Sequence, residues 1–508
     1  MKDEALSIAM ISDFFYPNVG GVENHIYMLS ANLIRRGHKV IVITHSHPPD
    51  RVGVRWLLPS LKVYYVPFMT IASSATLPNY FTFLPYFRTI IVREHIQLIH
   101  AHASLSSLGQ EGILHAHFFG VRTVFTDHSL FGFEDAASIL TNKLLAAALK
   151  NVDAVICVSH TGRENTVLRG QLFEPSEEDP SLSVVRSSVY TIPNALVAEQ
   201  FIPSPWPQPL ETINIVIISR LAYRKGIDLL VATAPRICAA FPNVNFIVGG
   251  DGPKLNDLLQ ARERHLLQDR IELLGPVRHR DVRDVLIRGS IFLNTSLTEA
   301  FGIAILEAAC TGLYVVSTRV GGVPEILPQD MISFANPDED GALPPFPCST
   351  IPFLSPFPLS FLLQRAHRFT HANTGHPHID VFRALSEAID IVTRGAHDRL
   401  EAHARVTRFY DWAHIAERTE AVYDAVVRSE SIDFETRVRR TMSLGPFAGL
   451  IYTIILVVDC LFFLFLEWWM PRHDMDFVRE HWKPDVFAEF AHKAQSSGEE
   501  APRSRTDT

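Results

Sequence analysis

The chain has few cysteines, and none of them form a close pair. Its 508 residues include five cysteines, an odd number, scattered without a Cys-x-x-Cys spacing. This pattern indicates reduced thiols rather than disulfides and favours a protein that faces the cytosol. The chain also lacks a long basic run, and its net charge is −9. Nucleic acid is therefore not expected as a partner.

Two familiar N-terminal signals are also missing. The apolar stretch at residues 8–11 is too short for a signal peptide and runs into Asp13. The next loop contains the paired glycines Gly20 and Gly21 but no G-x-G-x-x-G fingerprint, which disfavours a Rossmann-type dehydrogenase. Paired glycines let the backbone approach a ligand closely, here before an amphipathic helix predicted at residues 23–36.

Short apolar runs alternate with helical patterns along most of the chain. Each predicted strand is a continuous apolar run, as a parallel sheet covered on both faces requires. The predicted strands are residues 6–11, 40–44, 96–100, 121–126, 152–158, 190–193, 214–219, 245–249, 270–274, 290–294 and 314–317. Ligands of such sheets bind beyond the carboxyl ends of the strands, so residues that follow the strands are the candidate site.

The length of the chain suits two or three domains. The run PSPWPQP at residues 203–209 is typical of an extended linker between two sheet domains. We expect two Rossmann-like domains, at residues 1–198 and 199–408, and the second contains an irregular proline-rich loop at 337–361. After them we expect a cross-over helix and juxtamembrane segment at 409–446, a transmembrane helix at 447–466 and a polar tail at 467–508.

Two glutamates flank the start of a predicted helix in the run TEAFGIAILE. Glu299 lies in the loop after a buried strand, and the spacing places Glu307 one or two turns inside the helix. The N-terminus of such a helix can hold phosphates. Because carboxylates repel phosphates, we expect the two glutamates to bind neutral hydroxyls, those of a sugar and a ribose. A capped helix without a ligand is the alternative for either glutamate alone.

A second strand-to-helix loop contains two cations. Arg220 and Lys225 lie on either side of a turn that Gly226 allows. Two cations beside a helix N-terminus can neutralise a diphosphate leaving group, although an exposed structural pair is the alternative. The next predicted strand ends in the glycine-rich run GGDGP, which adds Gly250 and Gly252 to this side.

Several long runs resemble the retaining glycosyltransferases of family 4, which have the GT-B fold. The runs are FYPNVGGVENHIYMLS, RGHKVIVITHSH, LKVYYVPF, TVFTDHSLFGF, TNKLL, RENTVLR, SRLAYRKGIDLL, FLNTSLTEAFG and VVSTRVGGVPEILP, with AERTEAVYD at residues 416–424. Within that family the chain is similar to the PIG-A-type phosphatidylinositol N-acetylglucosaminyltransferases. It departs from them at Gly302, where cysteine is usual, and at residues 172–186 and 337–361, which look reworked.

The resemblance implies an α/β protein with two Rossmann-like sheet domains that face a cleft. The first domain would bind the acceptor phosphatidylinositol and the second the donor UDP-GlcNAc, in the first step of glycosylphosphatidylinositol (GPI) anchor synthesis. No metal or other cofactor is expected, because protein cations would neutralise the diphosphate. The resemblance implies that the donor is bound by Gly20, Gly21, Arg220, Lys225, Gly250, Gly252, Glu299, Phe301, Gly302, Ile303 and Glu307. It implies that the acceptor is bound by Asp13, Asp127 and His128. The implied catalytic residues are Glu299, Arg220, Lys225 and His128.

Two other functions are compatible with the same residues. One is a related lipid-linked mannosyltransferase that uses GDP-mannose. The other is a catalytically silent scaffold with the GT-B fold inside a membrane complex. The presence of Glu299, Glu307, Arg220 and Lys225 together argues against a silent scaffold.

Residues 447–466 contain one charge and are long enough to cross about 30 Å of hydrocarbon. Trp468 and Trp469 follow at the expected interface. An excess of arginine before the segment favours sheet domains on the cytoplasmic side, and the resemblance implies a single-pass protein of the endoplasmic reticulum. Asp459 would cost about 2.5–3.5 kcal/mol in mid-span, so we expect it to face another membrane subunit of a transferase complex.

Four histidines suggest a metal site only superficially. His100, His102, His115 and His117 are close in sequence, but no cysteine or carboxylate pattern accompanies them. We therefore expect core histidines rather than zinc ligands.

Overall fold

The computed structural model describes residues 5–478 except 19, 59, 73–74, 133–135, 177–181, 206–211 and 337–376. The proline-rich loop expected at 337–361, most of the linker expected at 203–209 and the tail beyond 478 lie outside the described residues. The chain divides into two compact units. Unit 1 comprises residues 1–126, 143–155 and 418–508, and unit 2 comprises residues 127–142 and 156–417. The domain limits expected from the sequence remain a prediction.

The N-terminal sheet has eight strands in the order β12-β9-β8-β7-β1-β2-β4-β3. The strands are β1 (Ser7–Ile11), β2 (Lys39–His45), β3 (Gly53–Leu58), β4 (Leu61–Val66), β7 (Leu98–His102), β8 (Arg122–Asp127), β9 (Ala154–Cys157) and β12 (Val189–Thr191). The central strands run parallel, with Ile8 opposite both Val40 and Leu98. Among the described pairings of this sheet, only that of the edge strand β3 is antiparallel. The predicted parallel sheet is therefore confirmed.

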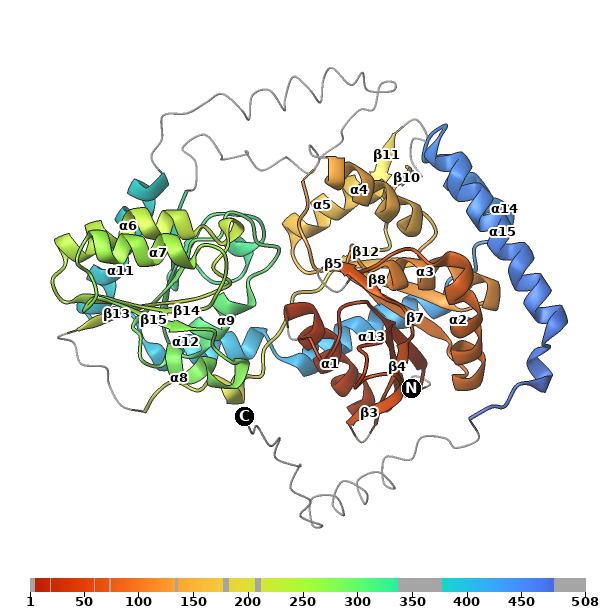
Figure 1. Ribbon diagram of the computed structural model, residues 1–508, viewed down its shortest axis with the longest axis horizontal. Helices are drawn as coiled ribbons and strands as arrows, with labels where there is room; N and C mark the ends of the chain where they lie inside the picture. The colour runs from red at the N-terminus through yellow and green to blue at the C-terminus, as the bar shows by residue number, and fades with distance from the viewer. Residues whose placement is uncertain are drawn as a thin grey trace, which may run out of the picture. The chain divides into compact units, whose positions relative to one another are not determined.

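The helices of this region follow the strands, as the alternating sequence pattern predicted (Figure 1). They are α1 (Gly21–Arg35), α2 (Tyr80–Glu94), α3 (Ser107–Ala116), α4 (Ala136–Leu149) and α5 (His160–Gly170), with short helices η1 (His117–Phe119) and η2 (Ala198–Gln200). Two small ribbons, β5 (Thr70–Ala72) with β6 (Ala75–Thr76) and β10 (Phe173–Pro175) with β11 (Ser183–Val185), lie outside the main sheet.

The sheet of unit 2 has six parallel strands in the order β15-β14-β13-β16-β17-β18. They are β13 (Ile213–Ile218), β14 (Val244–Gly249), β15 (Ile271–Gly275), β16 (Ile291–Asn294), β17 (Tyr314–Thr318) and β18 (Ile332–Ala335). The helices are α6 (Ile227–Ala240), α7 (Leu255–Arg264), α8 (Val282–Leu286), α9 (Ile303–Cys310), α11 (Pro377–Thr393) and α12 (Arg399–Phe409), with η3 (Tyr223–Lys225), η4 (His279–Asp281) and η5 (Val323–Glu325).

Both faces of this sheet are buried, which explains the continuous apolar runs. Ile215 and Ile217 pack in one cluster with residues of α6 and α11. Val216, between them, packs in a second cluster with residues of α8, α9 and α12. Successive side chains of a strand point to opposite faces, so a sheet covered on both sides needs apolar residues throughout.

Four more elements complete the described chain: α13 (Trp412–Arg428), α14 (Phe434–Met442), α15 (Ala448–Trp469) and η6 (Arg472–Asp474). In unit 1, Tyr423 of α13 hydrogen-bonds through its hydroxyl to Nδ1 of His100 at 2.6 Å. Within the described residues, α15 is the one helix long and apolar enough to cross a membrane. It packs against α14 and α2 of unit 1. Figure 1 draws α14 and α15 in blue.

Candidate active site

The loop after β13 holds the two predicted cations. Arg220 is exposed where the strand ends, and Lys225 ends the short helix η3 just before α6. Gly226 has φ +64°, and a Cβ there would lie 1.8 Å from the carbonyl oxygen of Thr295. Only glycine fits this turn, because the loop after β16 packs directly on it. The Thr295 hydroxyl also donates a hydrogen bond to the Lys225 carbonyl at 2.8 Å.

Lys225 and Glu299 form an ion pair at the carboxyl edge of the sheet. The distance from Lys225 Nζ to Glu299 Oε2 is 2.6 Å. Neither side chain is fully buried, with exposed fractions of 34% for lysine and 19% for glutamate. The structure therefore brings together the residue predicted to bind the diphosphate, Lys225, and the residue predicted to bind the sugar, Glu299, at a position that a ligand can reach.

The glycine-rich turn after β14 packs on the Arg220 loop. Gly250 has φ +141°, and a Cβ there would lie 1.9 Å from the Ser219 carbonyl oxygen. A Cβ on Gly252 would lie 2.3 Å from the carbonyl oxygen of Leu221, whose N–H donates to the Asp251 carbonyl at 2.8 Å. These glycines are required by backbone packing. Their contact with the donor remains a prediction.

Helix α9 begins at Ile303, directly after Gly302, as the sequence predicted. Gly302 has φ +98°, in the left-handed region that favours glycine. The Phe301 ring is buried and lies 6.0 Å from the Tyr410 ring in an edge-on contact. The Phe301 side chain thus belongs to the core. The N-terminus of α9, which begins at Ile303, remains the candidate anion site.

Glu307 lies one turn inside α9, within the range that its spacing predicted. Its side chain is 12% exposed, and Nδ1 of His279 lies 3.9 Å from its Oε1. Burial raises the pKa of Glu307 from 4.5 to about 8. Near neutral pH the carboxyl group is therefore largely protonated before a ligand arrives. Ribose hydroxyls that donate to it would stabilise its charged form.

The loop after β17 holds the backbone of Glu299 in place. Gly321 has φ +51°, and a Cβ there would lie 2.0 Å from the Glu299 carbonyl oxygen. The N–H of Gly322 donates to the same oxygen at 3.1 Å. The next carbonyl, that of Ala300, accepts a hydrogen bond from the Ser159 hydroxyl at 2.8 Å. Two successive peptide groups are thus fixed by different parts of unit 2.

Sequence reasoning missed both side chains that connect the start of α5 to these loops. Ser159 is the N-cap of α5, where its Oγ accepts from the Gly162 N–H at 3.0 Å. Glu325 accepts hydrogen bonds from the backbone N–H groups of His160 at 2.6 Å and Thr161 at 2.9 Å. The serine directly before this helix could have been recognised from the sequence as its N-cap. Nothing in the sequence pointed to its partners on the loops after β16 and β17.

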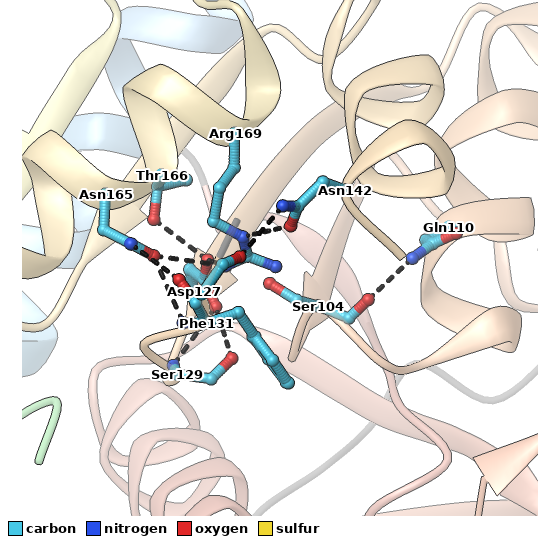
Figure 2. Close-up of polar contacts among 10 residues, drawn as sticks. Ser104, Gln110, Asp127, Ser129, Phe131, Asn142, Asn165, Thr166 and Arg169 are labelled. Atoms are coloured by element: carbon cyan, nitrogen blue, oxygen red, sulfur yellow. Dashed lines mark hydrogen bonds and ion pairs between the residues drawn. The ribbon is translucent and has the colours of Figure 1, made fainter. Parts of the chain in front are cut away.

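Asp127 is the centre of a polar cluster at the end of β8 (Figure 2). Its Oδ1 accepts from the Ser129 hydroxyl at 2.9 Å, and its Oδ2 accepts from the Thr166 hydroxyl at 2.9 Å. Arg169, whose side chain is fully buried, approaches the same Oδ2 at 3.2 Å. Asn142 then accepts from Arg169 Nε at 2.6 Å. Both carboxylate oxygens of Asp127 are therefore engaged by this chain. His128 follows it and is half-buried.

Asp13, Gly20 and Gly21 belong to unit 1. The Asp13 carboxylate is fully buried, and its Oδ1 accepts from the Thr76 hydroxyl at 3.0 Å. Burial, opposed by hydrogen bonds, raises the pKa of Asp13 from 3.8 to about 6. Helix α1 begins at Gly21, and a Cβ on Gly20 would lie 2.5 Å from a carboxylate oxygen of Glu23. The predicted helix is present but begins two residues before the expected start at residue 23, whereas donor and acceptor binding by these residues remain predictions.

Three of the four histidines lie in polar contacts of unit 1. His100 hydrogen-bonds through Nε2 to the Thr126 hydroxyl at 2.6 Å, in addition to its contact with Tyr423. His117 Nε2 lies 2.7 Å from the Asn151 carbonyl oxygen. His115 is fully buried, and its Nδ1 lies 3.5 Å from Oδ2 of Asp459.

The orientation expected for Asp459 is wrong. This residue is on the face of α15 that packs against unit 1, and its side chain is fully buried there, facing His115. The sequence showed a carboxylate on an apolar helix, where its burial costs free energy. It did not indicate that α3 of the same chain would cover it, so the reason to expect a contact between Asp459 and a different protein no longer holds.

Comparison with known proteins agrees with this architecture. Residues 45–135 match the family described as PIGA (GPI anchor biosynthesis), and residues 212–343 match glycosyl transferases group 1. The phosphatidylinositol N-acetylglucosaminyltransferase gpi3 subunit of Schizosaccharomyces pombe is 46% identical over 92% of this chain and 91% of its own length. The Homo sapiens relative, also named as a subunit of phosphatidylinositol N-acetylglucosaminyltransferase, is 43% identical over 92% of this chain and 87% of its own length.

Solved structures confirm the predicted GT-B fold. A glycosyltransferase from Rickettsia africae has a TM-score of 0.58 and 13% identity, covering 84% of this chain and all of that one. Anabaena HepE, solved with UDP and glucose, has a TM-score of 0.58 and 16% identity, covering 83% of this chain and all of that one. Together with the sequence relatives, these likenesses show that the chain belongs to the PIG-A (GPI3) family of phosphatidylinositol N-acetylglucosaminyltransferase subunits, glycosyltransferases with the GT-B fold.

Proposed function

We propose that the chain transfers N-acetylglucosamine from UDP-GlcNAc to the inositol of phosphatidylinositol, with retention at the anomeric carbon. The observation that supports this most is the Lys225–Glu299 pair, with a separation of 2.6 Å beside the N-terminus of α9. A cation for the diphosphate and a carboxylate for sugar hydroxyls are adjacent there. Glu307 lies further along the same helix.

On the donor side, Arg220 and Lys225 stabilise the departing diphosphate, together with N–H groups at the start of α9. Glu299 accepts hydrogen bonds from hydroxyls of the transferred sugar. Glu307, buried and largely neutral near pH 7, accepts hydrogen bonds from the ribose. No metal ion has a role in this proposal, because these protein groups supply the positive charge.

On the acceptor side, His128 is the residue proposed to contact the inositol. Asp127 has a positioning role, since its oxygens already bind Ser129, Thr166 and Arg169. It fixes the end of β8, from which His128 follows.

The proposed location is the endoplasmic reticulum membrane, with the sheet units in the cytosol and other membrane subunits of a transferase complex as partners. The chain is bound to the membrane through α15, the helix with the required length and composition. In this proposal residues 447–466 cross the membrane once.

The test is a transfer assay on membranes that contain the complex. Phosphatidylinositol is supplied with radiolabelled UDP-GlcNAc or with radiolabelled GDP-mannose, and Lys225→Ala membranes serve as the control. Labelled glycolipid from UDP-GlcNAc alone, absent in the control, is the expected result. Labelled glycolipid from GDP-mannose alone would indicate that the chain is a mannosyltransferase. If the complex is assembled but neither donor gives labelled glycolipid, the chain would be a catalytically silent scaffold.

A further inference from the structure

The loop after β8, residues 128–132 and here called the acceptor loop, is held by side chains of two helices. Asn165 of α5 binds both polar groups of the Phe131 backbone. Its Oδ1 accepts from the N–H at 3.4 Å, and its Nδ2 donates to the carbonyl at 3.0 Å. Asn142 of α4 donates to the next carbonyl, that of Gly132, at 3.1 Å. Two successive residues of the loop are therefore fixed through their backbones.

Arg169 of α5 holds this arrangement together (Figure 2). Its side chain is fully buried, and its Nε donates to Asn142 Oδ1 at 2.6 Å. Because that oxygen accepts from Arg169, the NH2 group of the same amide is directed to the loop. The guanidinium also lies 4.7 Å from the centre of the Phe131 ring, and it approaches Asp127 Oδ2 at 3.2 Å. A buried cation needs such partners, and here they connect α5 to the loop and to the end of β8.

The acceptor loop also packs on the glycine that supports Glu299. A Cβ on Gly321 would lie 2.6 Å from Cδ1 of Leu130 and 2.0 Å from the Glu299 carbonyl oxygen. Both approaches require glycine at this position, where φ is +51°. The Leu130 side chain is half-buried there. A single glycine is thus in contact with the acceptor loop and with the backbone of Glu299.

His128 lies between two points at which the chain is attached. Asp127, directly before it, is fixed through its carboxylate, and Leu130 and Phe131, shortly after it, are fixed by packing and by hydrogen bonds. A segment this short cannot shift far when both ends are held, because each residue spans at most about 3.6 Å. His128 and Glu299 also belong to the same compact unit. The acceptor loop and its contacts therefore fix where His128 lies relative to Glu299.

We propose that Arg169 and Leu130 are positioning residues for the transfer. Arg169 keeps the acceptor loop in its shape, and Leu130 sets the distance of that loop from Glu299. This assignment rests on the function proposed above, in which His128 contacts the inositol and Glu299 the sugar. The reacting atoms of such a transfer must come within about 3–3.5 Å, and a displacement of about 1 Å can lower the rate roughly 100-fold.

Steady-state kinetics of Leu130 variants test the packing contact. Leu130→Ala withdraws the side chain from Gly321, so turnover should fall roughly 10-fold. The KM for the nucleotide sugar should stay unchanged, because the residues proposed to bind the diphosphate and the ribose lie on other loops. Leu130→Met nearly keeps the volume and should restore most of the rate. Ile391→Ala, a truncation at a half-buried position of α11 in the same unit, is the control and should retain wild-type turnover.

Variants on the other side of the loop test the hydrogen-bond contacts. Arg169→Lys keeps a charge beside Asp127 but loses the fork that also reaches Asn142, so turnover should fall several-fold and the KM for phosphatidylinositol should rise. Asn142→Ala removes the bond to Gly132, leaves Arg169 paired with Asp127, and should have the same effect in smaller measure. A lower melting temperature with wild-type turnover in both variants would show that these contacts are structural only.

A double variant tests whether both sides act through the one loop. Leu130→Ala combined with Arg169→Lys should be little slower than the slower single variant, whereas losses that multiply would show independent effects and overturn the proposal. All rates are measured in membranes with whichever nucleotide sugar the wild type transfers. Mannose transfer by the wild type would overturn the proposed donor and leave this comparison intact. Wild-type turnover in both Leu130→Ala and Asn142→Ala would overturn the positioning roles and leave the proposed transfer intact.

Discussion

The amine of Lys225 lies 2.6 Å from a carboxylate oxygen of Glu299, although 74 residues separate them in sequence. Each residue follows a strand of the same parallel sheet, β13 or β16, and those strands are neighbours. Without a donor, the groups proposed to bind the diphosphate and the sugar neutralise each other. Donor binding would replace this internal contact by two contacts to the substrate, one for each group.

Removal of either cation should slow transfer strongly. We expect Lys225→Ala and Arg220→Ala each to lower turnover by roughly 10²–10³, because a cation directed at developing negative charge stabilises the transition state by a few kcal/mol. Initial rates at saturating UDP-GlcNAc measure the effect. Arg394→Ala, at an exposed ion pair at the end of α11, is the matched control and should keep normal turnover. Near-normal turnover in both site variants, with folding intact, would contradict their role.

The two glutamates should differ in which kinetic quantity they affect. Glu299→Gln should mainly lower turnover, because the sugar loses its position. It should leave UDP affinity unchanged or slightly higher, since it removes the anion that competes for Lys225. Glu307→Gln should mainly weaken UDP binding, because donated ribose hydroxyls would favour the ionised form of the Glu307 carboxyl group, which an amide cannot adopt. Calorimetric titration with UDP distinguishes them. Equal affinity of wild type and Glu307→Gln for UDP would rule out the ribose role.

The sheets could be predicted from sequence because burial on both faces leaves a clear signal. The strand expected at 214–219 is β13 at Ile213–Ile218, a shift of one residue. The edge pair β3 and β4 was not predicted as strands. Val54 and Trp56 of β3 are 44% and 48% exposed, and an exposed edge strand does not produce a continuous apolar run.

The candidate site was predictable where a residue follows a strand, and not where it depends on a distant contact. Lys225 and Glu299 were both expected at the sheet edge, and they meet there. Ser159 and Glu325 were missed, since their partners lie more than 100 residues away in sequence. Asp459 was misplaced for the same reason: its cost in an apolar helix is a local property, whereas the neighbour that covers it comes from the tertiary fold.

Glu307 should make stability depend on pH. Its pKa is raised from 4.5 to about 8 by burial, so between these values the folded chain holds a proton that the unfolded chain has lost. The contribution of Glu307 to the free energy of unfolding is therefore greatest at low pH. It falls as pH rises towards 8, by about 1.4 kcal/mol per pH unit at most. Relative to Glu307→Gln, wild type should lose thermal stability from pH 5.5 to 8. Melting curves of the purified proteins test this, and a constant difference between them would contradict it.

Activity should persist in excess EDTA. Arg220, Lys225 and the start of α9 supply the positive charge that the diphosphate needs, so chelation removes nothing required for transfer. The measurement is GlcNAc transfer after prolonged chelation, with a magnesium-dependent enzyme in the same buffer as control. Complete loss of transfer, restored by manganese or magnesium, would contradict the prediction and would require a metal site.

Ser159 should act as a positioning residue for Glu299. Its hydroxyl donates to the Ala300 carbonyl at 2.8 Å, one peptide after Glu299, while it also caps α5. Without this hydroxyl the Ala300 carbonyl loses that bond, and the Gly322 contact to the Glu299 carbonyl remains. We expect Ser159→Ala to lower turnover about 5–10-fold, since one such hydrogen bond contributes about 1 kcal/mol, and to leave the KM for UDP-GlcNAc nearly unchanged.

Loss of the helix cap alone must be separated from this effect. Asp398 caps α12 in the same unit, where its carboxylate accepts from the N–H groups of Leu400 and Glu401 within its own helix. Asp398→Ala should therefore lose a similar stability, about 1 kcal/mol, with normal turnover. Ser159→Thr keeps the hydroxyl and should restore most of the rate. If Ser159→Ala loses stability but keeps full turnover, as Asp398→Ala should, then Ser159 caps its helix and does not position Glu299.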